Sequence, residues 1–546
     1  MFPQLQQQAL RHARMVKVMA TSGVIRPYGP LTLAGIGKTI FDWGIGFAGG
    51  IGALAIRSPQ ETGLIDELGE LTWAELDERS TRLAHELKEV GVSEGDSVAL
   101  LCRNHRYFVD ASTALSKLGA DILYLNTAFS APQLGEVCKR EQPAAIIYDD
   151  EFTEMIDKSG IDVTRVIAWH DGEVGDLPRV EDLIEKGSTE KHRVPDHTSR
   201  PVILTSGTTG TPKGAPRGES GLDGAVALLS KMPFKTGGTT YIVAPLFHTW
   251  GWAHLNMAML LGSTMVLRRK FDPADCLETI QKYDVDSLIV IPVMMQRIMK
   301  LSEDERSGDW SKLRVVAASG SALPGDLATD WMDAFGDNLY NTYGSTEVAW
   351  ATIAQPQDMR EAPGTAGKAP YNTVVKIYDE KGHEVEQGES GRIFVGNTML
   401  FGGYTGDEDE GKEMVDGLMS SGDVGRIDEK GRLFVEGRDD EMIVSGGDNV
   451  FPKEVEDCLS RHGSVEDVAA IGVDDDDYGK RLRAFVVKSG DVDEKTLKDH
   501  VKENLARYKV PREIVFLDEL PRNATGKVLK KDLKDYDEDV KPASGD

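Results

Sequence analysis

The ten residues Thr205–Gly214 read TSGTTGTPKG, a composition suited to holding the phosphates of a nucleotide. Glycine lets the backbone turn where a Cβ atom would clash, so that successive N–H groups can point at one anion. The hydroxyl side chains add hydrogen-bond donors and the lysine adds a mobile positive charge. An ordinary surface turn is the alternative, but it would not explain the lysine. We predict a phosphate-binding loop made of Thr205, Ser206, Gly207, Thr208, Thr209, Gly210 and Lys213.

This loop differs from the P-loop of kinases and GTPases. The P-loop has glycine immediately before its lysine and serine or threonine immediately after it. Here Pro212 precedes Lys213 and Gly214 follows it, which argues against a P-loop nucleotide hydrolase. The preceding run Pro201–Leu204 is apolar and is typical of a buried strand. We therefore expect the loop at the end of a strand, where open α/β sheets bind ligands.

Four further motifs follow the loop along the chain. They are Tyr343–Glu347 (YGSTE), Ser421–Asp423 (SGD), Gly437–Asp440 (GRDD) and Pro521–Lys527 (PRNATGK). In this order, the five motifs together resemble those of the adenylate-forming superfamily, and within it those of acyl-CoA synthetases. The resemblance covers most of the chain, and the most similar members known to us are bacterial medium-chain and long-chain fatty acid CoA ligases.

The resemblance implies that a carboxylate attacks the α-phosphorus of ATP, which gives an acyl adenylate and pyrophosphate. Two anions must then meet, and two unit charges about 4 Å apart interact by roughly 4 kcal/mol at an effective dielectric near 20. Lysine and Mg²⁺ can offset this repulsion. By resemblance, Lys527 binds the reacting carboxylate and the α-phosphate, Thr346 bonds the α-phosphate, and Glu347 is the Mg²⁺ ligand. A solvated lysine and a surface carboxylate are the plain alternatives for Lys527 and Glu347.

The resemblance also assigns residues to the adenine and the ribose. Tyr343 offers an aromatic face to the base, Asn341 bonds its exocyclic amine, and Gly320 allows a close backbone approach on the other side. Asp423 has acceptor oxygens for both ribose hydroxyls, and Arg438 can reach the sugar or a phosphate as a rigid fork.

The second step of the implied reaction transfers the acyl group to the thiol of coenzyme A. The family uses one site for both steps by rotating its small domain, so that Lys527 leaves the site. Asp440 matches the hinge position of the family. Gly446 and Gly447 match the glycines that face the pantetheine channel, where a Cβ atom would obstruct a narrow tunnel.

The segment Pro245–Trp252 (PLFHTWGW) bears on the identity of the acid. Amino-acid-activating relatives have an aspartate just after the phenylalanine, but here His248 takes that position, which disfavours an amino acid. His248 is expected to orient the carboxylate or the pyrophosphate. Trp252 stands where some long-chain relatives have an aromatic gate to the acyl tunnel, with simple core packing as the alternative.

We therefore predict an ATP-dependent, AMP-forming ligase that joins a medium-chain or long-chain fatty acid to coenzyme A, with Mg²⁺ as the metal. An aryl or short-chain acid CoA ligase, or an acyl-AMP ligase that loads a carrier protein, are the alternatives, because all share the ATP motifs. A non-catalytic nucleotide-binding or acyl-binding sensor is a third class. Against the sensor, the chain retains Lys213, Glu347, Asp423, Arg438 and Lys527.

Size and charge exclude several other classes. A chain of 546 residues exceeds the usual size of one domain. The net charge of −28 repels nucleic acid phosphates, so no DNA or RNA partner is expected. The four cysteines form no CxxC pair, which argues against a disulfide framework or a zinc site and fits the cytoplasm. Histidine spacing gives no reason to expect a metal site either. The oligomeric state stays open.

Residues 1–55 form an N-terminal arm of unusual composition. No acidic residue precedes Asp42, whereas five basic residues do, and the stretch Leu31–Ile56 is largely apolar and rich in glycine. Lys38 and Asp42 interrupt that stretch, so we expect no membrane-spanning helix. Two interpretations stay open. The arm packs on the protein, or it makes peripheral contact with anionic lipid at the inner membrane surface.

Short apolar runs alternate with helical patterns after Glu70, which predicts an α/β fold with parallel sheets. From about 373 to 437 the pattern changes to short β segments joined by turns, typical of a small β-barrel or meander. A mixed helix and strand pattern follows. We predict a large ATP-binding and acyl-binding domain at 56–438 and a smaller, mobile α+β lid domain at 439–546.

Overall fold

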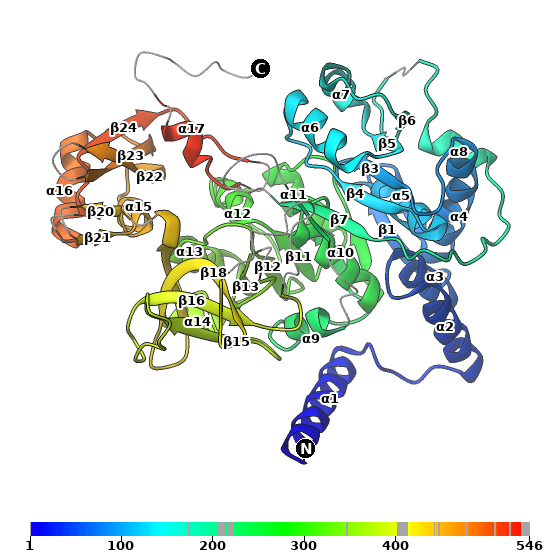
Figure 1. Ribbon diagram of the computed structural model, residues 1–546, viewed down its shortest axis with the longest axis horizontal. Helices are drawn as coiled ribbons and strands as arrows, with labels where there is room; N and C mark the ends of the chain where they lie inside the picture. Colours follow the sequence, from blue (N-terminus) through cyan, green and yellow to red (C-terminus); the bar gives the residue numbers. More distant parts are fainter. Residues whose placement is uncertain are drawn as a thin grey trace.

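The structure is a computed structural model, and four β-sheets with their covering helices organise it (Figure 1). Two sheets form the N-terminal body, a third lies beside them, and the fourth belongs to the C-terminal part of the chain. The predicted α/β body with a smaller α+β C-terminal domain is confirmed. The residues described are 2–172, 175–205, 213–216, 222–345, 348–400, 413–441, 443–445, 448–475, 479–506, 509–523, 526–534 and 536.

A six-stranded sheet forms one half of the body, at the upper right of Figure 1. Its strands pair in the order β6-β5-β3-β4-β7-β8, all parallel except β8, which is antiparallel to β7. Alternate residues of β3 face opposite ways, toward α4, α5 and α8 on one face and α6 and α7 on the other. The strands are β3 (Ser97–Leu101), β4 (Asp121–Tyr124), β5 (Ala145–Tyr148), β6 (Thr164–Ile167), β7 (Pro201–Thr205) and β8 (Lys213–Pro216). The helices are α4 (Trp73–Glu89), α5 (Arg106–Leu118), α6 (Ala131–Glu141), α7 (Thr153–Ser159) and α8 (Val180–Lys186), with a 3₁₀ turn η1 (Asp150–Phe152).

An eight-stranded sheet forms the other half, in the order β14-β13-β12-β11-β9-β10-β1-β2. Its six central strands are parallel, and only the edge strands β2 and β14 run antiparallel to their neighbours. The strands are β1 (Thr62–Asp66), β2 (Gly69–Thr72), β9 (Thr239–Ile242), β10 (Thr264–Val266), β11 (Ser287–Val290), β12 (Val315–Ala318), β13 (Leu339–Tyr343) and β14 (Thr352–Ala354). The accompanying helices are α9 (Asp223–Leu229), α10 (Thr249–Leu261), α11 (Pro273–Lys282), α12 (Pro292–Met299), α13 (Gly325–Phe335) and α14 (Pro356–Glu361).

The third sheet lies at the lower left of Figure 1 and is antiparallel throughout. Its long strand β18 pairs with β16, β17 and β19, so this one strand holds the sheet together. The recorded pairings describe an open order, β15-β16-β18-β17 with β19 on β18, within the region predicted as a small barrel or meander. The strands are β15 (Val374–Tyr378), β16 (Gly391–Gly396), β17 (Met414–Val415), β18 (Leu418–Ile427) and β19 (Leu433–Arg438).

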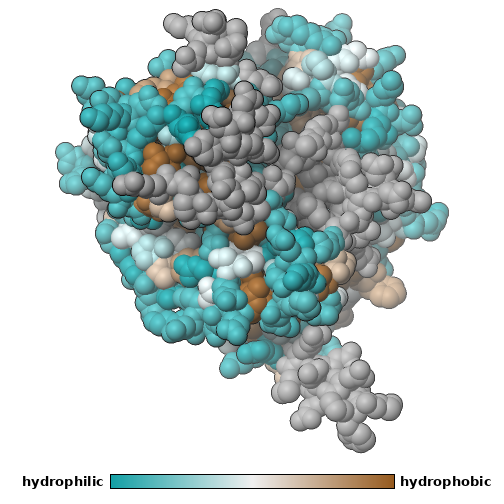
Figure 2. All heavy atoms as spheres, turned by 60° about the vertical axis from the view of Figure 1, so that its left-hand side comes forward, coloured by the Kyte–Doolittle hydropathy of each residue, from teal (hydrophilic) through white to brown (hydrophobic). Residues whose placement is uncertain are grey.

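The C-terminal part has its own sheet and its own buried core, separate from the clusters of the body. A 3₁₀ turn, η2 (Asp439–Glu441), is its only link to β19 along the chain. We propose that the domain boundary predicted between 438 and 439 lies at this turn. The face on this side of the molecule is predominantly hydrophilic (Figure 2). The elements are β20 (Ile443–Ser445), β21 (Asp448–Val450), α15 (Pro452–Leu459), β22 (Val465–Asp475), β23 (Gly479–Lys488), α16 (Glu494–Asn504), β24 (Glu513–Leu517) and α17 (Lys530–Lys534).

Three helices form the N-terminal arm, α1 (Phe2–Ser22), α2 (Pro30–Trp43) and α3 (Phe47–Arg57). Helix α3 is packed into the body and buries Phe47, Ile51 and Leu54. The end of α1 is anchored where Thr236 N–H donates to the Ser22 carbonyl at 3.1 Å. Helix α2 buries no residue, although it packs along α3. No helix in the described part of the chain is both long and apolar enough to cross a bilayer.

Candidate active site

A cleft of about 3580 Å³ lies between the body, the third sheet and the C-terminal domain. This volume exceeds the roughly 300–1,000 Å³ of a pocket for one small ligand, so the cleft has room for more than one substrate. Eight of the predicted site residues that the structure describes line it: His248, Trp252, Gly320, Asn341, Tyr343, Asp423, Arg438 and Lys527.

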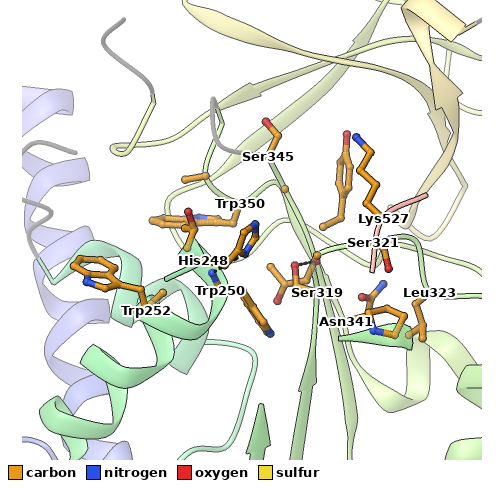
Figure 3. A pocket seen from close by; sticks show the side chains of 18 of the residues that line it. His248, Trp250, Trp252, Ser319, Ser321, Leu323, Asn341, Ser345, Trp350 and Lys527 are labelled. Atoms are coloured by element: carbon orange, nitrogen blue, oxygen red, sulfur yellow. Dashed lines mark hydrogen bonds between the residues drawn. The ribbon is translucent and has the colours of Figure 1, made fainter. Parts of the chain in front are cut away.

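The carboxyl ends of β12 and β13 form the floor of the cleft (Figure 3). Gly320 follows β12 with φ of +99°, a left-handed conformation that favours glycine. Ser319 fixes this turn, because its hydroxyl donates to the Thr342 carbonyl at 2.8 Å. Asn341 is only 8% exposed, and its Oδ1 atom accepts no hydrogen bond from the residues that the structure describes. A buried acceptor without a partner is costly, so Asn341 is suited to receive a donor such as the exocyclic amine of adenine.

A polar group lies where the floor of the cleft meets the third sheet. It consists of Tyr343, Asp423 and Arg438. The Tyr343 hydroxyl donates to Asp423 Oδ2 at 2.5 Å and lies 3.2 Å from the Ser421 hydroxyl. Burial, together with the Asp423 carboxylate, raises the pKa of Tyr343 well above its usual value, so the phenol stays protonated and donates. Asp423 and Arg438 are neighbours across β18 and β19, with 3.6 Å between Asp423 Oδ1 and Arg438 Nη1. Tyr343 and Arg438 therefore hold the Asp423 carboxylate in place at the wall of the cleft.

The predicted phosphate-binding loop connects two paired strands. Thr205, at the end of β7, and Lys213, at the start of β8, are direct partners in the antiparallel pair. The loop therefore begins and ends at one point of the sheet edge, as predicted for a strand end, whereas the returning strand β8 was not predicted. Several predicted residues lie outside the described residues: Ser206, Gly207, Thr208, Thr209, Gly210, Thr346, Glu347, Gly446 and Gly447.

Helix α10 carries His248 and Trp252 along one side of the cleft (Figure 3). His248 is the N-cap residue, and its Nδ1 accepts from Trp250 N–H at 3.4 Å. The helix ends at Gly262, which has φ of +60°. Capping by His248 fixes the imidazole at the helix start, one turn before the Trp252 indole. Both parts of the predicted acid site therefore lie on one rigid element.

Lys527 enters the cleft from the C-terminal domain, on the side opposite α10 (Figure 3). It follows a tight turn in which Asn523 Oδ1 accepts from Lys527 N–H at 2.9 Å. Gly526 has φ of +78°, and a Cβ atom there would lie 2.5 Å from Val293 Cγ1 of α12. The turn is thus pressed against the body. Lys300 at the end of α12 forms an ion pair with Glu466 of β22, a second contact that joins the two domains.

A buried asparagine, Asn104, connects the two sheets of the body and was not predicted from the sequence. Asn104 is 6% exposed, and its Nδ2 donates to the carbonyls of Ile242 at 3.1 Å and Ala244 at 3.0 Å. Its Oδ1 accepts from Leu246 N–H at 2.9 Å. The bonded segment leads directly into His248. Asn104 is therefore placed to position the start of α10 from the neighbouring sheet.

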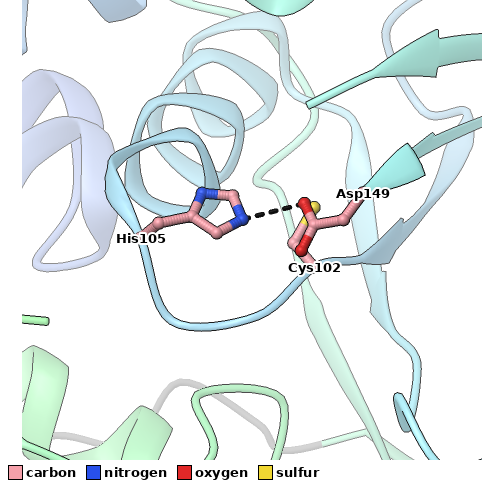
Figure 4. Close-up of side chains that lie close together, drawn as sticks. All are labelled: Cys102, His105 and Asp149. Carbon is pink, nitrogen blue, oxygen red and sulfur yellow. Dashed lines mark hydrogen bonds and ion pairs between the residues drawn. The ribbon is translucent and has the colours of Figure 1, made fainter. Parts of the chain in front are cut away.

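The turn that carries Asn104 rests on a buried cluster beneath it (Figure 4). Atoms of Cys102, His105 and Asp149 that could bind a metal lie within 4.8 Å of one another. His105 Nε2 is 2.8 Å from Asp149 Oδ1, and Arg103 N–H donates to Asp149 Oδ2 at 2.8 Å. Burial and the Asp149 charge raise the pKa of the Cys102 thiol well above its usual value, so it stays protonated and is a poor metal ligand. Hydrogen bonding accounts for the cluster, and all four cysteines of the chain are free.

We expect Asn104→Ala to lower both stability and activity. The variant leaves two carbonyls and one N–H unpaired, for a loss of about 3 kcal/mol in the free energy of unfolding. Because α10 loses its support, we expect kcat/KM to fall at least tenfold, measured at a temperature where the variant is folded.

Asn338→Ala is the matched control for this change. Asn338 is also buried, and its Nδ2 donates to the carbonyls of Leu313 and Phe335, both at 3.0 Å, away from the cleft. It should lose comparable stability while kcat/KM stays within about twofold. An equal fall in kcat/KM for both variants would show that Asn104 acts on stability alone.

Two groups of cleft residues were not predicted from the sequence. Trp350 lines the cleft close to the YGSTE motif, and a Cβ atom at Gly224 would lie 3.2 Å from its ring. The second group comes from the arm and contains three apolar residues at the spacing i, i+4, i+7. This helical spacing is the sequence pattern from which the group could have been predicted. It consists of Ile36, Ile40 and Trp43 of α2.

Comparison with known proteins agrees with this geometry. The family model for the AMP-binding enzyme matches residues 54–405, and that for the AMP-binding enzyme C-terminal domain matches residues 454–527. The chain belongs to the AMP-binding enzyme family. This AMP-binding enzyme is an acid–CoA ligase of the AMP-forming type, and ATP and coenzyme A are its co-substrates.

Its relatives are similar over nearly their whole length. It is 31% identical over 497 residues to a feruloyl-CoA synthase of an Amycolatopsis species, covering 89% of this chain and 98% of the relative. It is 33% identical over 486 residues to a 2-succinylbenzoate–CoA ligase of Geobacillus kaustophilus, covering 88% and 96%. The crystal structure of an anthranilate CoA ligase with anthranoyl-AMP matches with a TM-score of 0.80 at 26% identity, covering 89% and 96%. These relatives are named for ring-bearing acids, so they do not support the fatty acid specificity expected from the sequence.

Proposed function

We propose that this AMP-binding enzyme activates an aromatic carboxylic acid and transfers it to coenzyme A. The observation that carries the proposal is the set of indole rings around His248, where Trp250, Trp252 and Trp350 all line the cleft (Figure 3). Flat aromatic walls favour a ring, because aromatic pairs contribute about 0.5–1.5 kcal/mol beyond their buried area. The ring-bearing acids of the relatives support the same class.

In the proposed first step the acid carboxylate lies between α10 and Lys527. Two walls of the cleft bring these groups into one cavity, His248 from the body and Lys527 from the C-terminal domain. Lys527 offsets the negative charge as the carboxylate oxygen bonds to the α-phosphorus and pyrophosphate leaves. His248 orients the carboxylate. Mg²⁺ would neutralise phosphate charge when bound, with Glu347 as its proposed ligand and Thr346 beside the α-phosphate.

We propose that the nucleotide binds along the floor of the cleft and along the wall formed by the third sheet. Asn341 receives the adenine amine with its unpaired oxygen, Tyr343 lies against the base, and Gly320 lets the backbone approach the other side. Asp423, held by the Tyr343 hydroxyl, accepts from the ribose hydroxyls, with Arg438 beside it. The loop at Thr205–Lys213 holds the outer phosphates. In the second step the glycines Gly446 and Gly447 are proposed to face the pantetheine arm of coenzyme A.

A panel of acids tests the proposed specificity. Purified protein is incubated with ATP, Mg²⁺, coenzyme A and one acid at a time, drawn from cinnamic, benzoic, indolic, short-chain and C8–C16 aliphatic acids. AMP and thioester are measured by mass spectrometry. We expect kcat/KM for the best aromatic acid to exceed that for every aliphatic acid at least tenfold, or about 1.4 kcal/mol.

One variant tests which wall of the cleft is responsible for the preference for aromatic acids. Trp350→Leu should lower kcat/KM for the best aromatic acid about fivefold and change that for aliphatic acids less. Trp310→Leu, which removes a half-buried indole outside the cleft that packs edge-to-face against Phe335, is the control and should change neither. A preference for aliphatic acids would overturn the proposal and return the fatty acid hypothesis. Adenylate without thioester would point to a carrier-protein acceptor.

A further inference from the structure

The arm helix α2 presents an apolar stripe to solvent. Leu31 is 90% exposed, Phe41 is 89% exposed, and Leu33 is 50% exposed. A surface helix normally turns its apolar side inward and its polar side to water. In α2 apolar side chains also face outward, and the exposed charged residue of this helix is Lys38, whose side chain is 76% exposed. We name the three residues Leu31, Leu33 and Phe41 the α2 stripe.

The inward side of α2 is already occupied, so the stripe is not a misplaced core face. Gly35 and Gly52 let α2 and α3 approach closely, since a Cβ atom at either would lie 3.2 Å from Ile56 or 3.0 Å from Thr39. The inner residues Ile36, Ile40 and Trp43 line the cleft. Within the described residues nothing covers the stripe. Large exposed apolar residues are also concentrated here, with seven of the thirteen found between 16 and 56.

The charge of the arm contrasts with that of the rest of the chain. Residues 1–56 contain five basic residues and one acidic residue, whereas the whole chain carries −28. Arg14, Lys17, Arg26 and Lys38 are exposed, and Lys38 forms an ion pair with Asp42 on α2. Helices α1 and α2 project from the same side of the body, at the bottom of Figure 1. The positive charges and the α2 stripe therefore lie on one end of the molecule.

We propose that the arm is a membrane-docking element that lies on an anionic bilayer, with the α2 stripe among the acyl chains and the basic residues at the headgroups. An apolar face combined with basic residues is what an interfacial helix requires. A second copy of the chain suits the stripe less well, because pairing stripe to stripe would bring like charges together. This proposal is independent of which acid the enzyme uses. It places the arm side of the cleft, at Ile36, Ile40 and Trp43, next to the apolar phase.

Vesicle flotation of the full chain tests the proposal. The probes are vesicles of phosphatidylcholine alone and vesicles with 30 mol% phosphatidylglycerol, each at 0.1 M and 0.5 M NaCl. We expect binding to the anionic vesicles at 0.1 M salt, and partition at least tenfold weaker to the neutral vesicles or at 0.5 M salt. Absence of binding to the anionic vesicles, or equal binding under all four conditions, would overturn the proposal.

A double substitution tests the stripe itself. Leu31→Gln with Phe41→Gln should lower partition to the anionic vesicles at least tenfold, which corresponds to about 1.4 kcal/mol. The matched control is Leu68→Gln with Leu177→Gln, which removes two apolar side chains, 52% and 37% exposed, outside the arm. The control should bind as the parent does. Neither pair lines the cleft, so ligase activity without vesicles serves as the check on folding.

One competing outcome is measurable in the same samples. If the stripe joined two copies, sedimentation without lipid would show a concentration-dependent dimer that the Leu31→Gln, Phe41→Gln variant loses. That result, with no vesicle binding, would assign the stripe to self-association and overturn the membrane proposal. Equal flotation of the variant and its control would do so as well.

Discussion

Lys527→Ala should abolish adenylate formation, with an expected loss of about 1,000-fold. The loss follows from removing one positive charge from a cleft in which a carboxylate must approach the α-phosphate, an interaction of about 4 kcal/mol at close range. The structure places this lysine in the cleft through a turn pressed on Val293. Pyrophosphate exchange measures the first half-reaction, and conversion of a supplied acyl adenylate to thioester measures the second. We expect the second to stay within about threefold of the parent.

Lys502→Ala is the control for this prediction. Lys502 is on helix α16 of the same domain, is exposed and does not line the cleft, so its removal changes the charge of the domain by the same amount. It should leave both half-reactions within about twofold. If Lys527→Ala slowed both half-reactions equally, Lys527 would contribute to both steps. The domains would then keep one fixed arrangement throughout the reaction.

The sequence predicted many strands of the body, because a strand that is buried on both faces consists of an unbroken run of apolar residues. The apolar run of residues 97–102 contains β3 (Ser97–Leu101), and the apolar run of residues 144–148 contains β5 (Ala145–Tyr148). Strand β8 was missed because its residues, Lys213–Pro216, carry no apolar pattern. They form a strand only because β7 offers free backbone groups. The order of strands in each sheet also depends on contacts between distant segments, which no local pattern records.

The motifs likewise predicted which residues meet, but not what holds them. Tyr343, Asp423 and Lys527 come from three different sheets or domains, and the structure places all of them on one cleft. Asn104 could not be predicted in the same way, because it donates to backbone carbonyls. Every residue has such a carbonyl, so the sequence does not show which of them will lie near Asn104. The contribution of α2 to the cleft was hidden for a related reason. Its composition indicated an apolar arm, but only packing against α3 shows which side faces inward.

Asp440→Pro should give the opposite result to Lys527→Ala. Asp439 is held by the body, since Arg392 of β16 donates to its carboxylate at 3.0 Å. Glu441 is held by the C-terminal domain, through Lys530 at 2.7 Å. We propose that the residue between these two anchors, Asp440, is the hinge about which the domains turn, the role that the sequence predicted for it. Proline fixes φ there near −65°, compatible with the 3₁₀ turn observed.

The expected effect of Asp440→Pro is therefore on the second half-reaction. With Lys527 lining the cleft and the Lys300–Glu466 ion pair joining the domains, we expect that the domain moves before a thiol reaches the adenylate. We expect thioester formation to fall at least tenfold, while pyrophosphate exchange stays within about threefold. Asp440→Ala, which keeps φ free, should retain both activities. If proline left thioester formation unchanged, transfer to coenzyme A would have to proceed without rotation at this residue, and Lys527 and the thiol would share the cleft.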